Sequence, residues 1–255
     1  MLRLINKFVY RPEATFSDPA FTPADLGLAY EPLAIKTGDK LTLSAWYLPA
    51  PQPRYLMLYC HGNAGDIRDW VHAMPPFLQM GCSMLLFDYR GYGQSQGKPS
   101  EAGLYLDGEA VWGWVAAKAE EEGLTAVILG KSLGSAVAIH VACQAGAAQS
   151  PPAALILDSA FTSMREIALA VTPWLPDAMV PELYESLNAV PRLSCPTLVL
   201  HGRSDTLVPL AHGEQLYAAI TAPKTLHIID GADHNNLTGF PEYYAAIDTF
   251  LEKKK

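Results

Sequence analysis

The sequence predicts an α/β protein built on a mostly parallel sheet of about eight strands, with helices on both faces and a short cap. Two observations predict this class. Short apolar runs alternate with helical stretches along nearly the whole chain, a rhythm typical of strands joined by crossover helices. The 255 residues, 50% of them hydrophobic, suffice to bury a sheet covered on both faces. We expect one domain over residues 1–255, with the cap inserted at about residues 161–192.

The charge of the chain excludes one large class of functions. Lysine and arginine number 18 against 26 aspartates and glutamates, so the net charge is −8 at pH 7. A protein that binds a phosphate backbone needs a basic surface, so we expect no nucleic-acid partner. The four cysteines form no CxxC pair and the histidines are scattered, so we predict neither a metal site nor a cofactor.

The amino terminus bears on the location of the protein. It has no apolar stretch of signal-peptide length, and no segment of the chain reads as a membrane span. We therefore predict a cytoplasmic protein without a transmembrane span. One alternative stays open, because Leu2, Ile5 and Val9 fall near helical spacing between basic residues. An interfacial helix in peripheral contact with a membrane would have the same pattern.

The elements are justified in chain order. The sheet should begin with an antiparallel hairpin, because apolar runs at 33–36 and 41–48 flank the turn signal Thr37-Gly38-Asp39. Further strands are predicted at short buried apolar runs, at 54–60, 82–87, 125–129, 153–157, 197–200 and 226–229. Helices are predicted from 66 to the Pro75-Pro76 pair, from a Ser100 cap to a Gly123 stop, at 132–147 and at 241–251. Residues 161–192 break this rhythm with several prolines and no strand, so we predict that they form a small cap over the carboxyl end of the sheet. Ligands of open α/β sheets bind at that end.

Residues 130–134 read GKSLG and lie between a predicted strand and the helix that follows it. This is the G-x-S-x-G nucleophile elbow in the strand–turn–helix context that gives the motif its meaning. The turn lifts the Ser132 hydroxyl above the sheet, the flanking glycines avoid a Cβ clash, and the helix start favours a developing oxyanion. The letters GKS also end a phosphate-binding P-loop, but that motif needs glycine at position 125, where this sequence has Thr125.

A second loop is expected to complete the oxyanion hole. Residues 61–65 read HGNAG and follow the predicted strand 54–60. In this architecture one donor is the N–H after the nucleophile and the other comes from such a loop. These are the N–H groups of Leu133 and Asn63, with Ala64 as the neighbouring candidate. His61 is interpreted as a structural imidazole that bonds nearby backbone.

The other two members of a triad come later in the chain. Asp205 and His234 each lie in a loop after a predicted strand, so Ser132, Asp205 and His234 follow the chain order of this architecture. His234 would take the proton of Ser132 and return it to the leaving group, and Asp205 would hold the imidazole. Asp158 and Asp233 stay open as alternative acids, and the other histidines are interpreted as structural.

Seven segments together resemble the α/β-hydrolase superfamily, and more narrowly its BEM46-like serine hydrolases. They extend from about residue 22 to 237 and read TPADLGLAYE, LSAWYLPA, YCHGNAGD, LLFDYRGYGQSQG, GKSLGSAVA, CPTLVLHGRSDTLVP and GADHNNL. The resemblance implies an α/β-hydrolase fold with Ser132 as nucleophile, Asp205 as acid and His234 as base. Dehalogenases and epoxide hydrolases of this fold would carry aspartate at the elbow, where this chain has serine.

The sequence thus predicts a serine hydrolase that cleaves a carboxylic ester or thioester through an acyl-enzyme, as a carboxylesterase, thioesterase or lipase-like enzyme. The acidic chain and short cap indicate a small uncharged acyl substrate. The alternative is a catalytically idle scaffold of the same fold that binds a small molecule or protein. An apolar acyl pocket would be lined by Ala64, Phe161, Trp174, Leu175, Met179, Leu207 and Val208. For Trp174 and Met179 the alternative is that they pack the cap against the core instead of lining a pocket.

Overall fold

The computed structural model describes residues 9–15, 17–171, 180 and 182–252 of the chain. The chain divides into two compact units, Met1–Ile128 and Leu129–Lys255. The described residues form eight strands, hydrogen-bonded in the order β1-β2-β4-β3-β5-β6-β7-β8, and β5 (Thr125–Lys131) begins in the first unit and ends in the second. The predicted eight-stranded, mostly parallel sheet is therefore confirmed.

The first unit opens with the predicted antiparallel hairpin, after a short 3-10 turn at Pro23–Leu26. Strand β1 (Glu31–Lys36) pairs with β2 (Thr42–Leu48), with Lys36 opposite Thr42. The left-handed backbone of the connecting turn falls on Lys40, at φ 71°, rather than on the glycine of the predicted turn. Strand β2 is also antiparallel to β4 (Cys82–Phe87), so the parallel part of the sheet begins at β4 and β3 (Tyr55–Cys60).

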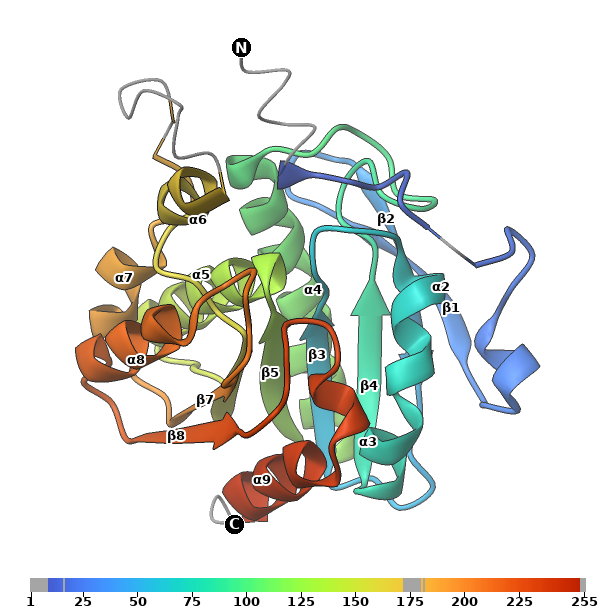
Figure 1. Cartoon of the computed structure of the whole chain (residues 1–255). Coiled ribbons are helices and arrows are strands. Elements are labelled where there is room, and N and C mark those ends of the chain that lie inside the picture. Colours follow the sequence, from blue (N-terminus) through green and yellow to red (C-terminus); the bar gives the residue numbers. More distant parts are fainter. Residues whose placement is uncertain (1–8, 16, 172–179, 181, 253–255) are drawn as a thin grey trace. The chain divides into compact units, whose positions relative to one another are not determined.

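Helices cover both faces of these strands in the first unit (Figure 1). On one face lie α2 (Ile67–Trp70), a 3-10 turn at Val71–Ala73 and α3 (Pro75–Gln79). The predicted helix ends before the Pro75-Pro76 pair, as α2 and the 3-10 turn. Pro75 stands at the first turn of the further short helix α3, where its missing N–H costs no hydrogen bond. On the other face, α4 (Glu101–Glu122) begins where the Ser100 hydroxyl accepts a hydrogen bond from the N–H of Gly103 and ends at Gly123 with φ 67°.

The second unit continues the strand–helix rhythm. Its elements are the end of β5, α5 (Leu133–Ala147), β6 (Ala154–Asp158), α6 (Met164–Val171), α7 (Ser186–Ala189), a 3-10 turn at Val190–Arg192, β7 (Thr197–Gly202), α8 (Leu210–Ala219), β8 (Lys224–Ile229), a 3-10 turn at Leu237–Gly239 and α9 (Pro241–Glu252). Strands β6, β7 and β8 are parallel in sequence order. Helices α8 and α9 lie on opposite sides of β7 and β8 (Figure 1). Consecutive strands therefore bring their carboxyl ends, and the loops after them, to one edge.

Two sequence expectations fall partly outside the described residues. In the cap segment, the structure describes α6, α7 and a 3-10 turn, and this described part contains no strand. Its role as a cap stays a prediction, as does an interfacial role for residues 2–9, most of which lie outside the described part. Among the described helices, none combines the length and the apolar character needed to cross a membrane.

Candidate active site

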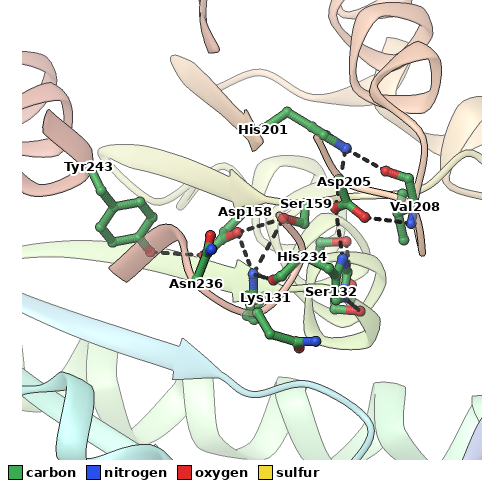
Figure 2. A network of polar contacts seen from close by, with 12 residues as sticks. Lys131, Ser132, Asp158, Ser159, His201, Asp205, Val208, His234, Asn236 and Tyr243 are labelled. Carbon is green, nitrogen blue, oxygen red and sulfur yellow. Dashed lines mark hydrogen bonds and ion pairs between the residues drawn. The ribbon is translucent and has the colours of Figure 1, made fainter. Parts of the chain in front are cut away.

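The three side chains predicted to form a triad meet in the second unit (Figure 2). The Nε2 atom of His234 lies 3.0 Å from the Oγ atom of Ser132. On the other side of the ring, the Nδ1 atom of His234 lies 2.8 Å from the Oδ2 atom of Asp205. His234 and Asp205 are each 6% exposed, so the imidazole and the carboxylate are shielded from water, whereas Ser132 is half-buried. In this order, an imidazole can take the proton of the hydroxyl while the carboxylate orients the ring and stabilises its charged form.

The elbow holds Ser132 in a strained conformation. Its backbone, at φ 51° and ψ −118°, lies outside the regions that ordinary residues favour. The N–H of Ser132 donates to the carbonyl oxygen of Asp158 at 2.9 Å, which ties the turn to the end of β6. A Cβ atom at Gly130 would lie 2.5 Å from the carbonyl oxygen of Gly134 and 2.6 Å from the Cα atom of Ser135. Glycine at this position is therefore required by the close approach of the helix that follows.

The carboxylate of Asp205 is held on both of its oxygens. Its Oδ1 atom accepts hydrogen bonds from the backbone N–H groups of Leu207, at 3.0 Å, and Val208, at 2.7 Å. Burial raises the pKa of Asp205, but the hydrogen bond from His234, the charge of that ring and the N–H of Val208 outweigh it, so the pKa lies below its usual range. The group is accordingly an anion near neutral pH, which suits it to accept a hydrogen bond from the Nδ1–H of His234.

The two alternative acids bind other partners. Asp158 accepts hydrogen bonds from Lys131 and Tyr243 through its two side-chain oxygens. The Oδ1 atom of Asp233 accepts one from the backbone N–H of Asn235. The hydrogen bond to Nδ1 of His234 is thus made by Asp205.

Three other histidines have their hydrogen bonds elsewhere. The Nδ1 atom of His61 lies 2.7 Å from the carbonyl oxygen of Gly62, and Nδ1 of His212 lies 2.8 Å from the Thr162 hydroxyl. The Nε2 atom of His201 lies 2.8 Å from the carbonyl oxygen of Val208 and 3.6 Å from Oδ2 of Asp205. These contacts agree with the structural interpretation, and they place His201 directly against the loop that contains Asp205 and Val208.

The two predicted oxyanion donors lie in different units. Leu133 is the first residue of α5, a position whose N–H has no partner within the helix. In the first unit, the carbonyl oxygen of Asn63 accepts hydrogen bonds from the backbone N–H of Arg11 and the hydroxyl of Tyr92. The carbonyl oxygen of Ala64 accepts one from the indole of Trp70. The donor role of Asn63 and the lining role of Ala64 stay predictions.

The predicted acyl-pocket residues of the second unit differ in exposure. Phe161 and Val208 are each 2% exposed, whereas Leu207 is 42% exposed. Trp174, Leu175 and Met179 lie outside the described residues. The backbone of Val208 contacts both Asp205 and His201, a part that its apolar side chain did not suggest.

Sequence reasoning missed a polar cluster directly behind Ser132 and His234. The ammonium of Lys131 contacts Asp158, Ser159 and the backbone of His234, and Tyr243 reaches the same aspartate (Figure 2). A signal was present, because a lysine between an apolar strand and a helix of small residues needs a buried counter-charge. In the described part of the chain, no group of three or more His, Cys, Asp or Glu side chains is placed to hold a metal ion.

Comparison with known proteins places this geometry in a family. The model of the alpha/beta hydrolase fold family matches residues 55–190, more than half of the chain. The chain belongs to the alpha/beta hydrolase fold family. Family membership supports a hydrolase, and the relatives of this family member include the protein bem46 of Schizosaccharomyces pombe. The two are 29% identical over 242 residues, which cover 90% of this chain and 79% of bem46, and the predicted BEM46-like resemblance is confirmed.

Two further comparisons agree with this placement in the alpha/beta hydrolase family. An uncharacterized protein of Mycobacterium tuberculosis is 35% identical over 234 residues, which cover 91% of this chain and 80% of that protein. Among solved structures, an esterase of Pyrococcus furiosus matches with a TM-score of 0.78 at 23% identity, over 96% of this chain and 97% of the esterase. At that identity the likeness concerns the fold alone.

Proposed function

We propose that this protein is a serine hydrolase that cleaves a carboxylic ester or thioester through a Ser132–His234–Asp205 triad. The observation that carries the proposal is the continuous chain of hydrogen bonds from the Ser132 hydroxyl through His234 to Asp205. The Oγ–Nε2 distance of 3.0 Å lies within the reach that direct proton transfer requires.

The mechanism follows from the geometry in two halves. In the first, Nε2 of His234 takes the Ser132 proton while Oγ bonds to the acyl carbon, and the carbonyl oxygen becomes an oxyanion near the N–H of Leu133. The imidazolium then gives its proton to the departing alkoxide or thiolate, and the acyl group stays on Ser132. In the second half, His234 takes a proton from water, hydroxide adds to the acyl carbon, and Ser132 leaves with the proton.

The carboxylate of Asp205 has two effects on this cycle. Because its Oδ2 atom accepts from Nδ1 of His234, the ring keeps its proton on Nδ1 and leaves Nε2 free to act as a base. Its negative charge also stabilises the imidazolium that forms in each half. The low pKa of the Asp205 carboxyl keeps that charge in place at neutral pH.

A fluorophosphonate probe, which phosphonylates an activated serine, tests the proposal. We expect labelling of the wild type and none of Ser132→Ala or His234→Ala, together with hydrolysis of p-nitrophenyl esters by the wild type only. Labelling that persists in Ser132→Ala would show that Ser132 is not the nucleophile. Absence of labelling in all folded forms would favour the idle scaffold, and so would a Ser132→Ala variant that keeps full biological activity.

The substrate and the location complete the proposal. We propose a small uncharged acyl ester or thioester, which agrees with the net charge of −8, and a cytoplasmic location without a nucleic-acid partner. A series of p-nitrophenyl esters of increasing acyl length gives the chain-length preference. Cell fractionation, with and without a salt wash, separates cytoplasmic protein from protein in peripheral contact with membranes.

A further inference from the structure

The ammonium of Lys131 occupies a central place behind the triad. Lys131 is the last residue of β5, directly before Ser132, and it is 6% exposed. Its Nζ atom lies 2.8 Å from Oδ1 of Asp158, 3.3 Å from Oγ of Ser159 and 2.7 Å from the backbone carbonyl oxygen of His234 (Figure 2). These three acceptors match the three N–H donors of an ammonium.

Asp158 connects this ammonium to the rest of the unit. Its Oδ1 atom also accepts from the Ser159 hydroxyl at 3.0 Å, and its Oδ2 atom accepts from the Tyr243 hydroxyl at 3.0 Å. Its backbone carbonyl oxygen accepts from the N–H of Ser132. Asp158, Ser159 and Tyr243 are all fully buried. One aspartate therefore holds both the nucleophile and the lysine beside it.

We infer that Lys131 is a positioning residue for the base, an inference that rests on the proposed function. Its ammonium binds the backbone carbonyl oxygen of His234, and its own backbone leads directly into Ser132. The side chain of Lys131 therefore holds the main chain of His234 at a fixed distance from the nucleophile. The imidazole then stays within hydrogen-bond reach of Ser132 through the reaction. A misplacement of about 1 Å between reacting groups can slow an enzyme by about 10²-fold, so a clamp at this point affects the rate.

The chemistry explains why an ion pair stands here rather than a neutral donor. A charge-assisted hydrogen bond is about twice as strong as a neutral one, and the contacts of 2.7 and 2.8 Å have the expected lengths. A buried ammonium needs a counter-charge, which Asp158 supplies. Without that carboxylate, the ammonium would also oppose the positive charge that His234 takes on during proton transfer.

Two variants separate positioning from folding. Lys131→Met removes the clamp and leaves the buried carboxylate of Asp158 without its cation, so we expect kcat to fall about 10²-fold, KM to stay within about twofold and the protein to lose stability. The double variant Lys131→Met/Asp158→Asn removes both charges. We expect it to regain stability relative to Lys131→Met but to keep the low kcat. Recovery of the wild-type kcat in the double variant would overturn the inference.

Tyr243→Phe is the matched control. It removes one buried hydrogen bond to Asp158 and leaves the contact between Lys131 and His234 in place. We expect it to lose stability while its kcat stays within about twofold of the wild type. A loss of kcat as large as that of Lys131→Met would show that any damage to the cluster slows the reaction, and would overturn the role given to Lys131.

A measurement without turnover separates this inference from the proposed function. In protein with 15N-labelled histidine, the Nδ1–H of His234 should give a downfield proton resonance, which His234→Gln assigns by its loss. We expect this resonance to broaden or vanish in Lys131→Met/Asp158→Asn and to persist in Tyr243→Phe. An unchanged resonance in the double variant contradicts the positioning role. A wild type that shows the resonance but is neither labelled nor active contradicts the proposed function alone.

Discussion

The Nε2 atom of His201 lies 2.8 Å from the carbonyl oxygen of Val208, whose own N–H donates to the carboxylate of Asp205. For Nε2 to donate to a carbonyl, the ring must carry its proton there, which leaves Nδ1 as an acceptor. Burial lowers the pKa of His201, so the ring is neutral near pH 7. His201 thus supports the loop of the acid from behind.

Gly213 faces this imidazole from α8. A Cβ atom at Gly213 would lie 2.6 Å from Nδ1 of His201. Alanine normally stabilises a helix interior over glycine by about 1 kcal/mol, but here the clash should reverse the sign. We expect Gly213→Ala to lower the free energy of unfolding by about 1–3 kcal/mol and to reduce kcat, because the ring and the Val208 carbonyl must shift.

Gly113→Ala in α4 provides the comparison for Gly213→Ala. A Cβ atom at Gly113 would meet nothing within 4 Å, so this variant should gain about 0.5–1 kcal/mol and keep its kcat. Urea unfolding and ester kinetics on both variants check the pair. Equal gains in stability would mean that His201 is not packed against α8 in solution.

Asp205→Asn should leave the fold intact and reduce kcat by about 10⁴-fold, as the same change does in another serine-hydrolase triad. The backbone N–H groups of Leu207 and Val208 select the amide oxygen for the Oδ1 position. The amide nitrogen then donates a hydrogen bond to Nδ1 of His234, so the ring carries its proton on Nε2. A protonated Nε2 can no longer accept the proton of Ser132. Steady-state ester kinetics measure the loss, with Asp233→Asn as the control that should change kcat by less than about twofold. Comparable losses in the two variants would remove the distinction between the acid and its neighbour.

Ala136→Leu tests the packing of α5. Ala136 is 3% exposed on a helix of small residues that packs against β6. The larger side chain should overpack this contact and cost about 1–3 kcal/mol of unfolding free energy. Ala147→Leu, at the exposed end of the same helix, should stay within about 0.5 kcal/mol of the wild type. Urea unfolding gives both values, and an unchanged midpoint and m-value for Ala136→Leu would contradict the packing.

His61 and Asp88 make opposite contributions to the pH dependence of stability. Their Nε2 and Oδ1 atoms are 4.0 Å apart in the first unit. Burial lowers the pKa of His61 to about 4 and raises the pKa of Asp88 to about 7. Between about pH 4 and 6.5, the native pair holds one proton, on Asp88, and the unfolded pair also holds one, on His61. The pair as a whole therefore gives no slope in this window.

Single variants of this pair should uncover the two slopes. In His61→Gln, Asp88 alone binds more protons folded than unfolded, so the unfolding free energy should fall as pH rises from about 4 to 7. In Asp88→Asn, His61 alone binds more protons unfolded, so the unfolding free energy should fall as pH drops from about 6.5 to 4. Each slope is at most about 1.4 kcal/mol per pH unit. Urea unfolding at three pH values measures them, and parallel curves for the two variants would show that neither pKa is shifted as described.

The three side chains that meet in the candidate site could be selected from the sequence because each leaves a local signal. Ser132, Asp205 and His234 each follow a strand, and parallel strands bring their carboxyl ends to one edge. The contacts behind these side chains leave a weaker signal. Lys131 indicates that a buried counter-charge is needed, but the folded chain decides that Asp158 supplies it and that Tyr243 binds the same carboxylate. Local geometry also escaped prediction where several residues share a turn, as at Lys40, because the residue that takes a positive φ depends on the hydrogen bonds of the whole loop.

The left-handed backbone of Ser132 places two opposite demands on one residue. Holding a non-glycine residue in such a conformation costs about 1–3 kcal/mol, and glycine would relieve most of it. A chain under no requirement to carry a hydroxyl at this position would become more stable by a single mutation to glycine. Stability therefore favours glycine at this position, and only the need for a hydroxyl favours serine. A screen that selects for thermostability without selecting for activity should recover Ser132→Gly among its first hits.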